Sequence, residues 1–342
     1  MAATRSSPSL QPRLWLRAFV GFYRPQPSAG EQLDPVARFL FSARAVILVI
    51  SAQASIIAGL LAITDRRFDP ISFLLLLVGL LVAHAISNLS NDYFGYRRGH
   101  DTPDSPRMRY TLHPQTSGLD TRSLLTGIGI LAVVGAAIVV FFTLTRGPVA
   151  LVFAVLGLLF LYLYDAAPVP LKSIGLGELA AFIVWGPLMV GGGYFVVAGR
   201  LSTAAFLVSI PYGLGVASIL VGKHIDQLNF DASHGNRTLP VVLGEAAARR
   251  LNQTVVIGMY AVSALLIIVG VLTPFAVLIA VAGRRAFAAI ERMAHPRPLA
   301  APPGYVGWPL WHHRACLVHN RLFGWAYIGG LALGAIFPAV RI

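Results

Sequence analysis

The 342-residue chain has few charged residues and only one cysteine. Charged side chains make up 12% of it, roughly half of the usual share in a soluble globular protein. Hydrophobic residues account for 56%, which excludes disordered and fibrous chains and is typical of a surface that faces lipid. Because Cys316 has no second cysteine to pair with, a disulfide scaffold within the chain is excluded as well.

Acidic residues are scarce, since 14 Asp and Glu stand against 27 Lys and Arg and give a formal net charge of +13. That charge alone would be typical of a nucleic-acid binder, but the low charged fraction argues against one. Lys and Arg near the ends of membrane helices stay in the cytoplasm, so the excess is better explained by topology. We therefore expect a lipid bilayer as a partner and no nucleic acid.

Apolar stretches long enough to cross about 30 Å of hydrocarbon recur along the chain. They cover residues 39–62, 71–91, 123–144, 148–164, 176–198, 202–222, 253–272, 274–294 and 322–340. The pattern predicts an all-α, polytopic membrane protein with about nine transmembrane helices in one bundle. Residues 38–342 would form this membrane domain. Residues 1–37 would lie at the membrane surface, because Arg13 and Arg17 interrupt the apolar run there.

The distribution of basic residues predicts the orientation of the bundle. With the N-terminus placed inside, 22 of the 27 Lys and Arg fall on the cytoplasmic face. The acidic clusters that follow the second and sixth apolar stretches are an even number of crossings apart, so they share that face. We expect an integral protein of a bacterial plasma membrane whose N-terminus and polar loops are cytoplasmic.

The first acidic cluster is SNLSNDYFGYRRGHDTPDSPRMRY, residues 87–110. Asn88 and Asp92 share one helical face, while Asp101 and Asp104 fall in a loop beyond the helix end. Carboxylate and amide oxygens suit Mg²⁺, and neighbouring arginines suit the anion that Mg²⁺ would bring. The predicted anion contacts are Asn88, Arg97 and Arg98. The alternative is an ordinary charged loop at the membrane surface.

The second acidic cluster, VGKHIDQLNFDASHGNRTLPVVLGE, covers residues 221–245 and repeats this logic with Lys223, Asp226, Asp231 and Arg237. Five-residue spacing turns the two aspartates about 140° apart on a straight helix. They can share a metal only if the helix ends or kinks near Asn229. The alternative is a local ion pair between Lys223 and Asp226.

A turn between the clusters, YDAAPVPLKSIGLGELAAF, presents Tyr164, Asp165, Lys172 and Glu178 at the mouth of the bundle. The chain has only two lysines, Lys172 and Lys223. Both lie in these polar segments, where a compact ammonium group can bind phosphate as a point charge. The distribution favours lysines that are kept for an anionic ligand.

In these segments the chain resembles the UbiA superfamily of intramembrane prenyltransferases, most closely the dihydroxynaphthoate polyprenyltransferases of menaquinone synthesis. The resemblance runs from about Phe39 to Phe337. It is carried by NDYFGYRRGHDTPDSP, YDAAPVPLKSIGLGE and HIDQLNFDASHGNRTLPVVLGE. It implies helices around a central cavity and two aspartate-rich motifs that hold Mg²⁺ and a prenyl diphosphate. By position, the family's motif residues fall on Asn91, Asp92, Asp101 and Asp231.

Each motif departs from the family pattern at one position. Many members carry aspartate where this chain has Gly95, and many carry aspartate where it has Gln227. Asp226 would replace the second loss by a shift of one position. The first loss is replaced only if Asp101 or Asp104 folds inward.

The resemblance implies Mg²⁺ held by Asp92 and Asp231, with help from Asp101, Asp104 and Asp226, and diphosphate charge stabilised by Lys172, Lys223, Arg98 and Arg237. The catalytic candidates are Asp92, Asp231, Lys172 and Tyr164. An aromatic, quinone-precursor-like acceptor would attack the allylic cation. One alternative is a terpene cyclase or a prenyltransferase with a non-aromatic acceptor. Another is a transporter or non-catalytic binder, but His84 is the one ionisable residue at mid-helix, and a single buried histidine is usually a hydrogen-bonded core residue.

Overall fold

The computed structural model describes residues 9–20, 33–110, 112–114 and 119–338, which are helical and contain no β-strand. The α-helices are α1 Pro12–Val20, α2 Pro35–Ser42, α3 Ala45–Thr64, α4 Pro70–Arg97, α5 Pro106–Tyr110, α6 Thr121–Arg146, α7 Pro148–Leu161, α8 Gly177–Ile183, α9 Gly193–Ala198, α10 Thr203–Ser233, α11 Leu239–Leu243, α12 Glu245–Ile268, α13 Gly283–Ala294 and α14 His312–Ile336. Two π-helical segments, η2 Tyr162–Ala166 and η4 Val184–Gly192, and two 3₁₀ segments, η3 Leu171–Ile174 and η5 Pro274–Ala282, join them. The all-α prediction is confirmed.

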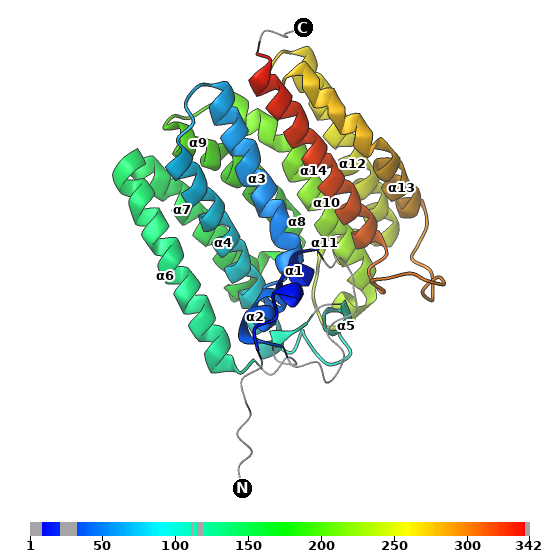
Figure 1. Cartoon of the computed structure of the whole chain (residues 1–342). Helices are drawn as coiled ribbons and strands as arrows, with labels where there is room; N and C mark the ends of the chain where they lie inside the picture. Colours follow the sequence, from blue (N-terminus) through cyan, green and yellow to red (C-terminus); the bar gives the residue numbers. More distant parts are fainter. Residues whose placement is uncertain (1–8, 21–32, 111, 115–118, 339–342) are drawn as a thin grey trace.

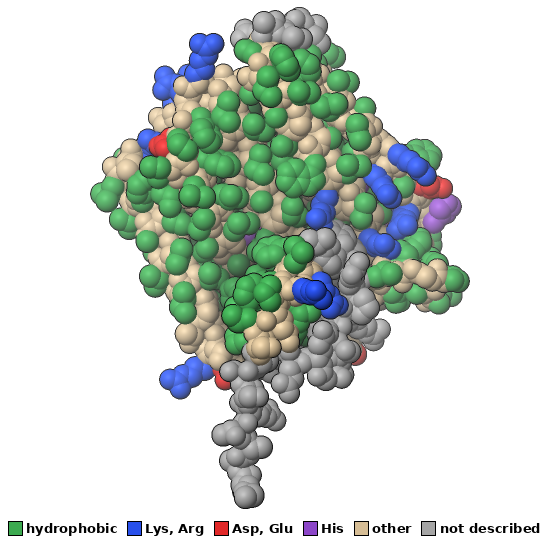
Figure 2. Space-filling view, in the orientation of Figure 1, with side chains coloured by type: hydrophobic (Ala, Val, Ile, Leu, Met, Phe, Trp, Pro, Cys, Tyr) green, Lys and Arg blue, Asp and Glu red, His purple; other side chains and the backbone are tan. Residues whose placement is uncertain are grey.

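The long helices run side by side as one bundle (Figure 1). Helix α10 packs against α12, α14, α8 and η4, and α3 packs against α4, α14 and η4. Helices α6 and α7 form one edge, where few of their side chains are buried. The short helices α1, α2 and α5 lie at one end of the bundle, and the described C-terminus lies at the other. The face in Figure 2 is largely hydrophobic, as expected of a surface in lipid.

Seven helices in the described residues are long and apolar enough to cross a membrane. The predicted count of nine is therefore not confirmed. The stretch 274–294 is divided between the 3₁₀ segment η5 and the amphipathic helix α13. Helix α14 has 25 residues, but polar side chains in its first half lower its hydropathy. These are His312, His313, Arg314, His319, Asn320 and Arg321.

The N-terminal segment predicted at residues 1–37 is described only in part, since residues 1–8 and 21–32 lie outside the described ranges. Within it, α1 buries Leu14 and Ala18 and exposes Leu16 and Phe19. The indole Nε1 of Trp15 donates to Asp34, at 3.1 and 3.0 Å from its two carboxylate oxygens. Asp34 also caps the start of α2, so it ties α1 to the bundle.

Two ion pairs close the end of the bundle opposite to α1, α2 and α5. Arg146, at the end of α6, lies 2.7 Å from the carboxylate of Asp69 and donates to the Val196 carbonyl at 2.7 Å. Arg200 lies 2.8 Å from Asp65, whose carboxylate also accepts from the Tyr194 hydroxyl. The pairs join the helix ends of α3, α4, α6 and α9.

Two helices extend beyond their predicted ends. Helix α4 continues to Arg97, and α10 continues to Ser233 rather than ending near residue 222. The second acidic cluster thus lies largely on a helix and not in a loop. Helix α10 ends where Gly235 adopts a positive φ of 72°, a conformation that glycine reaches at little cost.

Close backbone packing of α14 against η5 generates a stability prediction. A Cβ added at Gly330 would lie 2.7 Å from both the Ala276 Cα and the Phe275 carbonyl oxygen, whereas one at Gly329 would lie 3.7 Å from a Leu278 methyl group. Gly330→Ala should therefore lower the free energy of unfolding by roughly 1–3 kcal/mol through overpacking. The control Gly329→Ala should not. Thermal unfolding in detergent measures both, and equal midpoints would contradict the close approach.

Candidate active site

Two adjoining cavities occupy the bundle. The larger one has a volume of about 850 Å³ and is lined mainly by apolar side chains of α3, α4, α6, α7, η4 and α10. The smaller one, of about 60 Å³, is polar and lies among α4, α10 and the segments that follow them. Arg44, Asn91 and Lys223 line both cavities. One elongated ligand with a polar head and an apolar tail would fit this arrangement.

The small cavity, called the polar pocket below, collects residues from all three segments that the sequence singled out. Its charged or titratable lining residues are Arg44, His100, Asp101, Arg107, Lys172, Lys223, His224 and Asp231. The basic side chains outnumber the two carboxylates in this lining. The pocket therefore favours an anion over a bare cation.

Asp92 lies beside the polar pocket and is only 1% exposed. Its carboxylate forms ion pairs with Arg44 and Arg107, and the Arg107 Nε lies 2.8 Å from one oxygen. Arg44 precedes α3 with φ 55° and ψ 51°, a left-handed conformation that costs energy for a residue with a side chain. The backbone strain at Arg44 is tolerated where its guanidinium group neutralises a buried charge.

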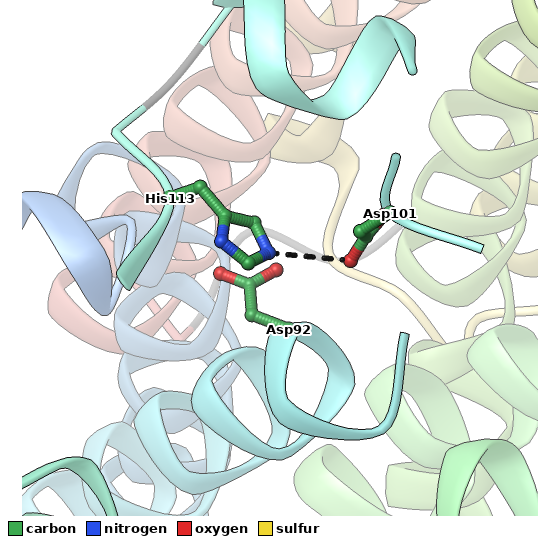
Figure 3. Close-up of side chains that lie close together, drawn as sticks. All are labelled: Asp92, Asp101 and His113. Carbon is green, nitrogen blue, oxygen red and sulfur yellow. Dashed lines mark hydrogen bonds and ion pairs between the residues drawn. The ribbon is translucent and has the colours of Figure 1, made fainter. Parts of the chain in front are cut away.

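Asp92, Asp101 and His113 point toward one another (Figure 3). They come from α4, from the loop after it and from the segment after α5, and each offers a ligand atom within 4.8 Å of the others. His113 Nε2 lies 3.3 Å from an Asp101 carboxylate oxygen. The Asp101 carboxylate occupies the place that a Cβ at Gly95 would need. Asp101 thus folds inward over Gly95, the position at which the resemblance predicted a missing carboxylate.

Lys172 joins the central turn to α4. Its ammonium group forms an ion pair with Asp165 and donates to the Asn91 side-chain oxygen at 2.9 Å. Tyr164, from the same turn, lines the large cavity. Lys172 therefore lies in the polar pocket, and Lys223 lies where the two cavities meet.

The structure separates the two aspartates of the second cluster. Asp231 lines the polar pocket, and one of its oxygens accepts from the Thr238 hydroxyl at 3.3 Å. Asp226 instead accepts from the backbone N–H groups of His312 at 3.1 Å and His313 at 2.9 Å. Because α10 runs unbroken to Ser233, the condition for a shared metal, a helix end near Asn229, is not met. Asp226 fixes the start of α14 rather than joining the pocket, and its side-chain partner is His312 Nδ1, at 3.0 Å, rather than Lys223.

Four further predicted residues point elsewhere. Arg97 is exposed and donates to the Tyr93 hydroxyl at 3.0 Å, and Arg98 donates to the Ala166 and Ala167 carbonyls at 3.0 and 2.8 Å. Arg237 and Asp104 are exposed and do not line the polar pocket. Arg98 holds the turn after η2 in place, so its role is positional.

Asn88 lies on the wall of the large cavity and donates to the Ala43 carbonyl at 2.9 Å. That contact fixes the chain just before Arg44. Asn88 therefore supports the site by positioning the backbone of a neighbouring residue.

A buried dyad of Glu178 and His224 was not predicted as part of the site. The His224 Nδ1 lies 2.6 Å from a Glu178 carboxylate oxygen, both residues are buried, and His224 lines the polar pocket. The sequence placed Glu178 at the mouth of the bundle but offered no sign of its partner 46 residues away. Arg44 was missed for the same reason, since its partner Asp92 is 48 residues away, and His113 was missed because it lies just beyond the first acidic cluster.

Several buried polar atoms around the polar pocket lack a hydrogen-bond partner within the described residues. They include His100 Nδ1, Thr102 Oγ1 and Ser105 Oγ. Partial burial lowers the pKa of His100, and the charges of Lys172 and Arg98 lower it further, so the ring is neutral at pH 7. Orphaned polar atoms, carboxylates and clustered cations together fit a hydrated divalent metal ion with an anion.

Comparisons with known proteins find similar sequences and similar folds. Residues 52–303 match the sequence model of the UbiA prenyltransferase family. The chain is 28% identical over 232 residues to a 1,4-dihydroxy-2-naphthoate octaprenyltransferase of Escherichia coli, covering 67% of this chain and 75% of that protein. A Bacillus subtilis protein of the same name is 26% identical over 59% of this chain and 64% of its own length. A UbiA homolog from Archaeoglobus fulgidus bound to GPP and Mg²⁺ has the same fold, with a TM-score of 0.57 and 13% identity over 85% of this chain and 99% of that one.

The contact between Gly95 and Asp101 generates a prediction about metal binding. In Gly95→Ala the new methyl group should push the Asp101 carboxylate out of the polar pocket and weaken Mn²⁺ binding roughly tenfold. Gly129→Ala is the matched control, because a Cβ there meets nothing within 4 Å. Electron paramagnetic resonance titration of the purified protein with Mn²⁺ measures the affinity. Equal affinities in the two variants would remove Asp101 from the metal site.

Proposed function

Because the chain belongs to the UbiA prenyltransferase family, we propose that it transfers a polyprenyl group from an allylic diphosphate to an aromatic, quinone-precursor-like acceptor. One observation carries the proposal. A polar pocket with a surplus of basic side chains opens, at Arg44, Asn91 and Lys223, onto an apolar cavity of about 850 Å³. This geometry matches the two ends of a prenyl diphosphate.

The diphosphate would lie in the polar pocket. Lys172 offers an ammonium group inside the polar pocket and Lys223 offers one at the junction of the cavities, while Arg44 and Arg107 offer guanidinium groups beside Asp92. These cations would stabilise the negative charge that grows on the departing oxygens when the allylic carbon–oxygen bond breaks. Arg97 and Arg237 are left out of this set because they are exposed.

Mg²⁺ is the cofactor that the residues fit. Asp92, Asp101 and Asp231 would hold it, with His113 adjoining the first two. When bound, the ion offsets diphosphate charge and makes the diphosphate a better leaving group. The structural relative solved with GPP and Mg²⁺ supports this assignment through its fold.

The large cavity would bring the two reactants together. Its apolar walls exclude water, which would otherwise quench an allylic cation. An electron-rich ring carbon of the acceptor forms the new bond to the allylic carbon, and the diphosphate leaves with the electrons of the broken carbon–oxygen bond. The ring then regains aromaticity as the attacked carbon loses a proton, or carbon dioxide where that carbon bears a carboxylate. The names of the E. coli and B. subtilis relatives favour a dihydroxynaphthoate as the acceptor.

The proposed location is a bacterial plasma membrane with the polar pocket on the cytoplasmic side. The excess of basic residues on that face supports the orientation. A cytoplasmic opening would give the polar pocket direct access to a water-soluble diphosphate head group.

A carboxylate series tests the site. Asp231→Asn and Asp101→Asn should each lower Mg²⁺-dependent diphosphate release roughly 100-fold, because each loses a charged ligand of the metal. Asp104→Asn should retain activity, since Asp104 is exposed outside the pocket. Size-exclusion chromatography in detergent checks that the variants fold. Wild-type turnover in Asp231→Asn would remove that residue from the catalytic site.

Product analysis separates the alternatives. Purified protein is incubated with Mg²⁺ and allylic diphosphates of several lengths, with and without 1,4-dihydroxy-2-naphthoate. We expect a prenylated aromatic product only when the acceptor is present. A cyclic hydrocarbon formed without acceptor would indicate a terpene cyclase, and binding without diphosphate release would indicate a non-catalytic binder.

A further inference from the structure

One group of hydrogen-bonded polar side chains lies at the large cavity, on a part of its wall away from the polar pocket. It consists of His84 on α4, Ser51 on α3 and Trp185 in η4. The Ser51 hydroxyl lies 2.8 Å from His84 Nδ1, and the Trp185 indole N–H donates to the same hydroxyl oxygen at 3.2 Å. The His84 and Trp185 rings meet edge to face with centroids 5.1 Å apart, and both residues line the cavity.

The hydrogen bonds assign the tautomer of His84. The indole can only donate, so the Ser51 oxygen accepts from it. The Ser51 proton then goes to His84 Nδ1 at 2.8 Å rather than to the weaker acceptor Met189 Sδ at 3.8 Å. The shorter contact favours an unprotonated Nδ1 and a ring proton on Nε2.

The Nε2–H group has no hydrogen-bond partner among the described residues. The sequence suggested a hydrogen-bonded core histidine, but only one of its two nitrogens is satisfied. The Nε2 atom is not fully enclosed by protein, and because His84 lines the large cavity, a ligand or water there can satisfy this donor. In a cavity with apolar walls, this donor offers a directional contact to a bound molecule.

His84 lies at a defined distance from the proposed diphosphate site. It precedes Asn91 by seven residues on the same helix, which is about 10 Å along the axis. Asn91 borders the polar pocket, whereas His84 borders only the large cavity. If the diphosphate lies in the polar pocket, His84 and Trp185 border the part of the large cavity that stays free for a second ligand.

We propose that His84 recognises the acceptor. Its Nε2–H donates a hydrogen bond to an oxygen on the acceptor ring, Ser51 holds the imidazole in the donating tautomer, and Trp185 provides an aromatic surface against which the ring packs. The ligand class is an aromatic hydroxy or keto compound. This inference rests on the proposed function for its reaction but makes a separate claim about where the acceptor binds.

The kinetic test compares KM values for the two substrates. His84→Leu should raise the KM for 1,4-dihydroxy-2-naphthoate about tenfold, the value of one hydrogen bond, and leave the KM for the allylic diphosphate and the Mg²⁺ dependence unchanged. His84→Gln should restore part of the affinity, because its amide can donate. The matched control is Ser55→Ala. Within the described part of the chain, the Ser55 hydroxyl donates only to the Ser51 carbonyl, at 3.0 Å.

A binding test does not depend on turnover. Titration with 1,4-dihydroxy-2-naphthoate should quench tryptophan fluorescence, and Trp185→Phe should lose most of the quench. His84→Leu should shift this titration about tenfold but leave titration with naphthalene, which has no oxygen, unchanged. If His84→Leu does not fold, the two titrations are compared in His84→Gln and Ser51→Ala instead.

The outcomes separate this inference from the proposed function. Prenyl transfer with an unchanged acceptor KM in folded His84→Leu would overturn the role of His84 and leave the prenyltransferase proposal standing. A His84-dependent quench without prenyl transfer to any acceptor would support the aromatic binding site and overturn the proposed reaction. Equal effects of His84→Leu on naphthalene and on dihydroxynaphthoate would show that His84 only shapes the cavity.

Discussion

The pairing of Asp92 with Arg44 and Arg107 is the contact on which the site depends. A carboxylate that is 1% exposed would be very costly without compensation, and removal of one partner of a buried pair leaves an uncompensated charge. The two arginines come from the residue before α3 and from α5, so neutralising one aspartate draws three segments together. The polar pocket forms where they meet, and its remaining positive charge is available to an anion.

The architecture was largely predictable because lipid imposes a simple requirement. Apolar stretches of sufficient length must be helical, since their backbone groups cannot bond to water in the hydrocarbon. The failures have local causes. Thr273 and Pro274 start a 3₁₀ segment, which divides the stretch 274–294, and the polar first half of α14 hides a 25-residue helix. Helix α10 continues beyond residue 222, and His224, Asp226 and Asp231 in this extension are buried, so tertiary packing that hydropathy does not report accompanies its extra length.

The sequence grouped polar residues that share one pocket, but it gave no sign of contacts between residues far apart in the chain. The sequence brought Asp101, Lys172, Lys223 and Asp231 together, and these do line one pocket. It could not tell that Asp226 is bound by backbone groups 86 and 87 residues away. The loss of a carboxylate at Gly95 looked like a deficit, yet the glycine makes room for Asp101. A substitution that appears to weaken a motif can thus relocate the same chemical group.

The two ion pairs at the far end of the bundle bear on how a membrane potential acts on the protein. In the proposed orientation, Arg146 and Arg200 are among the few basic residues on the outer side, but Asp69 and Asp65 cancel their charge. The difference in net charge between the two ends of the bundle is therefore larger than a count of Lys and Arg suggests. A potential that is negative inside stabilises such a dipole by about 2.3 kcal/mol per elementary charge per 100 mV, so the energised membrane itself would help to keep the polar pocket facing the cytoplasm.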